Sequence, residues 1–122
     1  MLFSLPAFAV DDLATPLNTT WTIVGFDGAT NATQANLIWN TPHEATTATV
    51  LVGLAANDLS LPPISVTTAA EVHQLSIPRL RPNTRYYFEV VATDADGVSV
   101  YSAVISKVTK PAGAAYSPMI VP

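Results

Sequence analysis

Residues 80–91 constrain the fold of this chain more than any other segment; they read L-R-P-N-T-R-Y-Y-F-E-V-V. Pro82 fixes its own φ and favours a turn, and Asn83 is a residue that turns tolerate well. From Tyr86 onward the residues are aromatic or β-branched, which is typical of a strand. One face of that strand would carry Tyr86, Phe88, Val90 and Ala92. The segment therefore predicts a turn that leads directly into a β-strand.

The rest of the chain also has the composition of short strands, and no window shows the 3.6-residue period of a helix. We expect these strands at residues 21–26, 34–39, 48–54, 64–67, 72–77 and 98–108. Asp27-Gly28 predicts a turn after the first, and Pro62-Pro63 restrict the fourth to a sheet edge. Asp94-Ala95-Asp96-Gly97 predicts a hairpin turn, because Gly accepts a positive φ. The predicted fold class is all-β, an antiparallel sandwich of two sheets.

Length, charge and cysteine content limit the kinds of protein this chain could be and the partners it could bind. The 122 residues suffice for one domain with a real core. Only 11% of residues are charged, so the surface must be rich in Thr, Ser and Asn, which suits a secreted protein or contact between copies. A net charge of −4 with five basic residues argues against nucleic acid as a partner. No cysteine is present, and no apolar run approaches the roughly 20 residues of a membrane span.

Five short motifs, in order, resemble a fibronectin type III domain. They are L-I-W-N-T-P at residues 37–42, A-T-T-A-T-V at 45–50, H-Q-L-S-I at 73–77, L-R-P-N-T-R-Y at 80–86 and T-D-A-D-G at 93–97. The likeness runs from about residue 23 to residue 110 and is strongest to bacterial and archaeal modules found beside secreted hydrolases and phosphatases. It implies a fibronectin type III or immunoglobulin-like sandwich of seven strands, with no catalytic site and no cofactor.

The resemblance also implies specific core residues. Tyr86 matches the tyrosine corner, in which the phenol hydroxyl bonds to backbone just upstream. Trp39 matches the tryptophan at the centre of the core. Together with the strand alternation, the expected core is Leu37, Trp39, Leu75, Leu80, Tyr86, Phe88 and Val90.

Residues that could carry chemistry are few and poorly spaced. His43 and His73 would need carboxylates such as Glu44 or Glu71 beside them to bind a metal, and no spacing here supports that. The D-A-D-G motif lacks the downstream bidentate Glu of a calcium loop. No Gly-x-Ser-x-Gly nucleophile elbow occurs. We therefore expect no metal, no cofactor and no enzymatic activity.

The sequence offers a candidate sugar-binding platform and two candidate glycosylation sites. Trp21, Trp39, Tyr101 and Tyr116 could form a stacking platform for a sugar ligand. The resemblance buries Trp39 and places Tyr101 where the family packs an aromatic side chain, which leaves Trp21 and Tyr116. Asn18 and Asn31 each begin an N-glycosylation triplet that would matter in an exported chain.

Both ends of the chain lie outside the resemblance and are apolar. Residues 1–18 would be an arm and connector, residues 19–110 the sandwich, and residues 111–122 a tail with several prolines. The triplet A-F-A at residues 7–9 has the form of a signal-peptidase site, so residues 1–9 are either the remnant of a signal peptide or a retained arm. A retained arm would present Leu2, Phe3, Leu5, Phe8 and Val10.

The apolar ends suggest the functional hypothesis, because accessory modules usually have polar, flexible linkers. In donor-strand assembly, an extended segment of one subunit adds to the sheet edge of the next, and such contacts build open filaments. The sequence favours a non-catalytic extracellular protein, a subunit of a filament or pilus whose partners are other copies of itself. The alternative is an accessory binding or spacer module of a secreted hydrolase, with carbohydrate as a candidate ligand.

Overall fold

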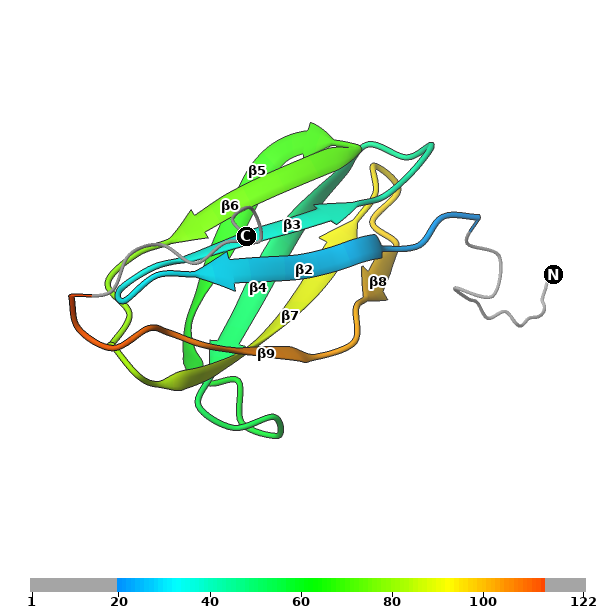
Figure 1. The fold of residues 1–122 in the computed structure, drawn as a ribbon. Helices are drawn as coiled ribbons and strands as arrows, with labels where there is room; N and C mark the ends of the chain where they lie inside the picture. The colour runs from blue at the N-terminus through cyan, green and yellow to red at the C-terminus, as the bar shows by residue number, and fades with distance from the viewer. Residues whose placement is uncertain (1–19, 114–122) are drawn as a thin grey trace, which may run out of the picture.

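The structure is a computed structural model that describes residues 20–113. Within that range the chain forms the strands labelled β2 to β9 in Figure 1. They are β2 (Val24–Thr30), β3 (Ala35–Asn40), β4 (Thr46–Gly53), β5 (Leu61–Ala70), β6 (Val72–Ile77), β7 (Arg85–Thr93), β8 (Ser99–Tyr101) and β9 (Ile105–Val108).

The strands form two antiparallel sheets that face each other (Figure 1). One sheet has the order β2-β3-β6, and the other has the order β5-β4-β7-β8, with β9 also paired to β7. Each of these pairings is antiparallel. The predicted all-β sandwich is confirmed.

The core lies between the sheets and follows from side-chain alternation. On β7, Tyr86, Phe88, Val90 and Ala92 are buried, while the residues between them are at least partly exposed. Trp39 is fully buried at the centre. Its ring stacks on His73 with centroids 5.1 Å apart, and it makes a T-shaped contact with Phe26 at a centroid distance of 6.3 Å. Each large side chain buried in this way contributes about 1.5–3 kcal/mol to folding.

The prediction for the first strand was wrong in its boundaries. We expected residues 21–26 and a turn at Asp27-Gly28, but β2 continues through that pair, and Asp27 lies opposite Ile38. A register shift between Val24 and Asp27, with Gly25 at φ +67, absorbs the irregularity. The turn comes later, where the Asn31 backbone N–H donates to the Gln34 carbonyl at 3.0 Å.

Two other predicted strands also differ from the structure. β5 is ten residues long rather than residues 64–67. Its two prolines are tolerated because β5 is an edge strand and its register shifts beside them. The predicted strand 98–108 is instead β8 and β9, both paired to β7. Between them, the Ser102 hydroxyl accepts the Val90 N–H at 2.9 Å, so a side chain replaces the backbone partner there.

Candidate functional site

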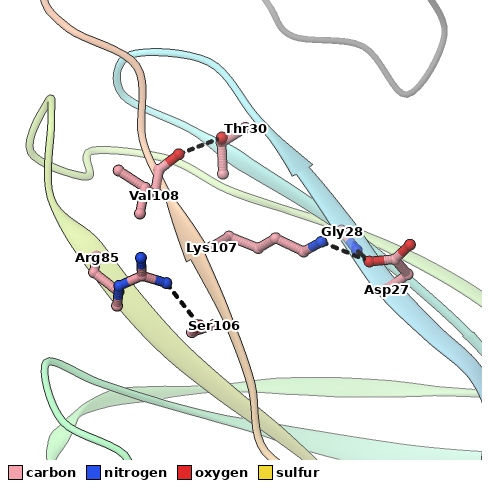
Figure 2. Close-up of polar contacts among 7 residues, drawn as sticks. All are labelled: Asp27, Gly28, Thr30, Arg85, Ser106, Lys107 and Val108. Carbon is pink, nitrogen blue, oxygen red and sulfur yellow. Dashed lines mark hydrogen bonds and ion pairs between the residues drawn. The ribbon is translucent and has the colours of Figure 1, made fainter.

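One side of the sandwich is closed by polar contacts between β2 and β9 (Figure 2). The Thr30 hydroxyl donates to the Val108 carbonyl at 2.8 Å, and the Lys107 ammonium lies 2.8 Å from the Asp27 carboxylate. The hydrogen bond from Lys107, and then that from the Gly28 N–H, hold the pKa of Asp27 below its usual value. Because Asp27 is 56% exposed, the ion pair itself is worth about 0–1 kcal/mol. These contacts join the two sheets along this side.

The opposite side, between β5 and β6, is open. These strands are the edges of different sheets, and Glu71 alone separates them in sequence. Away from Glu71, where β5 begins and β6 ends, lies a groove of about 440 Å³. Its floor is made of core side chains, and its rim of half-buried apolar ones. The floor is Val52, Ile77 and Tyr86, and the rim is Leu61, Ile64 and Leu80.

The end wall of the groove is the loop between β6 and β7. The Tyr86 hydroxyl accepts the Arg81 N–H at 2.8 Å, the geometry of a tyrosine corner. The Leu80 N–H donates to the Thr33 carbonyl at 2.9 Å. Arg79 has φ +63 and Asn83 φ +51, so the loop turns sharply at two residues that are not glycine. The loop is therefore anchored by hydrogen bonds near both of its ends.

Thr109 ties the end of the described chain to the same loop. Its side chain is 1% exposed, and its hydroxyl donates to the Arg81 carbonyl at 2.5 Å and accepts the Thr84 N–H at 2.9 Å. The carbonyl of Lys110, the next residue, accepts the Asn83 N–H at 2.9 Å. The chain thus leaves the sandwich beside the groove's end wall.

The groove is suited to binding rather than to acid–base chemistry. Its volume falls within the roughly 300–1,000 Å³ typical of ligand pockets, and its lining is mostly apolar. The ionisable side chains at its mouth are the exposed Arg79 and Arg81, alongside the buried phenol of Tyr86. Among residues 20–113 no three His, Cys, Asp or Glu side chains lie close enough together to hold a metal ion. The same range contains no helix long and apolar enough to cross a membrane.

The two histidines lie in unrelated environments. His73 is buried against Trp39, with its Nε2 2.9 Å from the Ala70 carbonyl oxygen. His43 is exposed in the loop after β3, and its backbone N–H donates to the Glu71 carboxylate at 3.1 Å. His73 lies on the edge strand β6, yet its side chain points inward and packs on the core tryptophan.

Asp94 organises the β7–β8 turn. Its carboxylate accepts the N–H groups of Val98 and Asp96 at 2.9 Å and the indole N–H of Trp21 at 3.0 Å. The hydrogen bond from Val98 is the main cause that lowers the pKa of Asp94, although burial opposes it. This carboxylate therefore holds a turn and the start of the described chain.

The structure corrects the expectations for two aromatic residues. Trp21 is only 7% exposed, so it offers no open face for a sugar. Tyr101, which we expected to be packed, is 64% exposed on the short strand β8. It lies opposite Val91, on the face of β7 that points away from the core. Tyr116 lies outside the described residues.

The remaining predicted residues are placed as follows. Leu37, Trp39, Phe88 and Val90 are fully buried, Tyr86 is 5% exposed, and Leu75 and Leu80 are half-buried against the core. Asn31 begins the β2–β3 turn, and its side-chain oxygen accepts the Thr33 N–H at 3.0 Å. Asn18 and the assembly arm, Leu2, Phe3, Leu5, Phe8 and Val10, lie outside the described residues.

Sequence reasoning missed the groove. Leu80 and Tyr86 were expected in the core, while Arg79 and Thr109 were assigned no role. No local signal indicated that residues 78–82 would form a wall. The groove depends on how two edge strands diverge, and no short window of sequence encodes that divergence.

Comparison with known proteins identifies the sandwich. The family model described as "Purple acid Phosphatase, N-terminal domain" matches residues 26–109. No curated protein compared with the chain matches it.

Three solved structures share the fold. A fibronectin type III domain of human fibronectin type III domain containing protein 3 has 19% identity and a TM-score of 0.52, covering 74% of this chain and 88% of its own. The sixth such domain of that human protein has 22% identity and a TM-score of 0.53, covering 76% and 88%. The FN5 domain of Drosophila Lar has 18% identity and a TM-score of 0.53, covering 76% and 96%. The predicted resemblance to fibronectin type III domains is confirmed.

Proposed function

The chain belongs to the family of purple acid phosphatase N-terminal domains, and from that premise we propose that it is an accessory module that works beside a phosphatase catalytic domain. A fibronectin type III-like module of this family is non-catalytic. The observation that carries the proposal is the extent of the match, which runs from Phe26 in β2 to Thr109 just after β9. Nearly the whole described sandwich is thus the unit that the family pairs with a phosphatase.

The outer face of the β2-β3-β6 sheet is the surface best suited to pack against that catalytic domain. β3 and β6 contain no Asp, Glu, Lys or Arg, and the one charged side chain of β2, Asp27, is paired with Lys107. Val72 is 72% exposed on this sheet and Ile38 40%. The outer face of the other sheet carries Arg85 and Glu89. Because interface cores are depleted in charge, the first face is favoured.

We place the module outside the cell, in keeping with secreted members of the fold. The low charge suits that location. The triplet that begins at Asn31 lies in the half-buried β2–β3 turn, where the Asn31 side-chain nitrogen is 3.4 Å from the Gln34 side-chain oxygen, a contact that an attached glycan would have to displace. Peptide mass analysis of material secreted from eukaryotic cells would detect a glycan at Asn31, and an unmodified peptide would remove this part of the proposal.

Titration calorimetry between the full chain and a purple acid phosphatase catalytic domain from the same organism tests the function. We expect saturable binding. Val72→Arg should weaken it by about tenfold or more, since a charge would enter the interface core. Tyr101→Arg is the matched control on the opposite sheet and should leave it unchanged. No binding by the unaltered chain would contradict the proposal, and sensitivity only to Tyr101→Arg would move the interface to the other face.

Assembly into filaments is a separate hypothesis that stays a prediction. Its donor residues lie outside the described chain, and the family match favours the accessory module. Light scattering of the full chain and of a chain lacking residues 1–10 would decide it. Polymers that disappear with the arm would support assembly, and a monomeric full chain would reject it.

A further inference from the structure

The groove between β5 and β6 leaves apolar side chains in contact with water among the described residues. Leu61, Ile64 and Leu80 are only half-buried at its rim, and beneath them lie Ile77 and Tyr86 of the core. Covering such a surface is favourable in proportion to the apolar area removed from water. The question is which segment covers it.

The sequence beyond the described sandwich contains a segment of matching chemistry. Residues 114–122 read A-A-Y-S-P-M-I-V-P and contain no charged side chain. Tyr116, Met119, Ile120 and Val121 are large enough for two or three of them to fill a groove of about 440 Å³. We propose that the groove is the docking site of the C-terminal segment, residues 114–122, of the same chain.

The path of the chain supports this occupant. Thr109 and Lys110 are hydrogen-bonded to residues 81–84, the loop whose earlier residues wall the groove. These hydrogen bonds place residues 109 and 110 on the β2–β9 side of that loop, so the segment that begins after Gly113 has only the loop to cross before it reaches the groove. Nine residues reach up to about 30 Å, which is ample to cross the loop.

The apolar N-terminal residues are less well placed to reach the same groove. At the start of the described chain, Trp21 is hydrogen-bonded to Asp94 in the β7–β8 turn. That turn follows β7, whereas the groove lies at Tyr86, where β7 begins. The nine residues of β7 span about 30 Å, and Figure 1 shows the two ends of the coloured ribbon on opposite sides of the sandwich.

The prolines indicate how the segment would bind. Pro118 has no N–H to donate to an edge strand, so docking would rely on side chains in the groove rather than on a full ladder of hydrogen bonds. Arg79 and Arg81 would stay solvated at the mouth, since the segment offers no side-chain carboxylate.

A spin label gives a direct test, because the chain has no cysteine and Ser117→Cys creates a unique attachment site. In the full chain, a nitroxide at this position should broaden the amide NMR signals of Ile64 and Leu80 while leaving that of Ser99 sharp. A charge introduced by Ile120→Asp should sharply reduce the broadening. Ala115→Asp adds the same charge nearer the tether and should preserve it.

Controls separate the other occupants. If isotope-labelled copies without a nitroxide are broadened by spin-labelled copies, the segment acts between molecules and the proposal is overturned. Broadening of the same amides by a label at Ser4→Cys would assign the groove to the N-terminal arm and also overturn it. Equal broadening in the Ile120→Asp and Ala115→Asp variants would show that the tether alone keeps the label nearby, with no docking. Docking within one chain is supported if the broadening is lost in Ile120→Asp, is kept in Ala115→Asp and is absent from the mixed sample.

Discussion

Replacing Thr109 by Val should destabilise the sandwich far more than its position at the end of the last strand suggests. The side chain is 1% exposed, and its hydroxyl makes hydrogen bonds to the Arg81 carbonyl and from the Thr84 N–H. Valine has nearly the same shape but neither polar function. Each lost hydrogen bond costs about 0.5–1.5 kcal/mol, and more when the partner stays buried and unpaired. The two together predict a loss of about 2–4 kcal/mol.

Urea unfolding monitored by tryptophan fluorescence measures this loss. The midpoint should fall while the slope stays the same, because the surface exposed on unfolding does not change. A loss of that size is a large share of the 5–15 kcal/mol that stabilises a typical domain. Thr68→Val is the matched control: Thr68 is exposed on the edge strand β5, and its change should stay within about 0.5 kcal/mol. If the two variants unfold at the same urea concentration, the described role of Thr109 is wrong.

Three further changes test other parts of the structure. Trp39→Ala empties the centre of the core and should cost about 3–5 kcal/mol or prevent folding, measured by the same unfolding curves. The pKa of Asp94 is lower in the folded state than its unfolded pKa of 3.8. The ionised Asp94 carboxylate therefore stabilises the fold above pH 3.8, and this stabilisation is lost as the pH falls through the lower folded pKa. Melting temperatures from about pH 6 to about pH 2 should therefore fall less steeply below 3.8 in Asp94→Asn than in the unaltered chain. Gly53→Ala should disrupt the β4–β5 connection, since an added Cβ would lie 2.1 Å from the Asp58 backbone oxygen. Gly97→Ala would meet no atom and should cost only about 1 kcal/mol because of the positive φ at that position. Circular dichroism melts distinguish the two variants, and equal melting temperatures would contradict the steric argument.

The parts of the fold that sequence predicted are those fixed by local pattern. Tyr86 to Ala92 alternates so regularly that both the strand and its buried face follow from it. The motif that ends in Tyr86 also implied the loop contact that the Arg81 N–H makes with the phenol. The two-sheet class followed because the predicted strands were short and numerous and no segment competed as a helix.

The errors arose where tertiary contacts override local preference. Asp27-Gly28 is a common turn pair, yet here a bulge and pairing with β3 keep it in a strand. Pro62-Pro63 shortened the predicted edge strand, although an edge position can tolerate prolines. Trp21 looked available for a ligand because its partner Asp94 lies 73 residues away in sequence.

The groove could not be predicted for the same reason. Val52, Ile64 and Ile77 come from three different strands. The β6–β7 loop that forms the end wall is held by the hydroxyl of Thr109. Nothing in the local sequence of any of these residues indicates that they meet. The open side becomes apparent only in the structure, where contacts join the two sheets between β2 and β9 and a groove separates β5 from β6.

The central proposal is that this chain is a non-catalytic module that works beside a phosphatase catalytic domain, and a hydrolysis assay tests it most directly. The rate of p-nitrophenol release from p-nitrophenyl phosphate would be measured for the purified chain, for a purple acid phosphatase catalytic domain, and for their mixture. The account predicts that the chain alone releases product no faster than buffer and that all turnover follows the catalytic domain. Turnover by the chain alone that falls when one of its own side chains, such as His43 or Asp94, is replaced would contradict it.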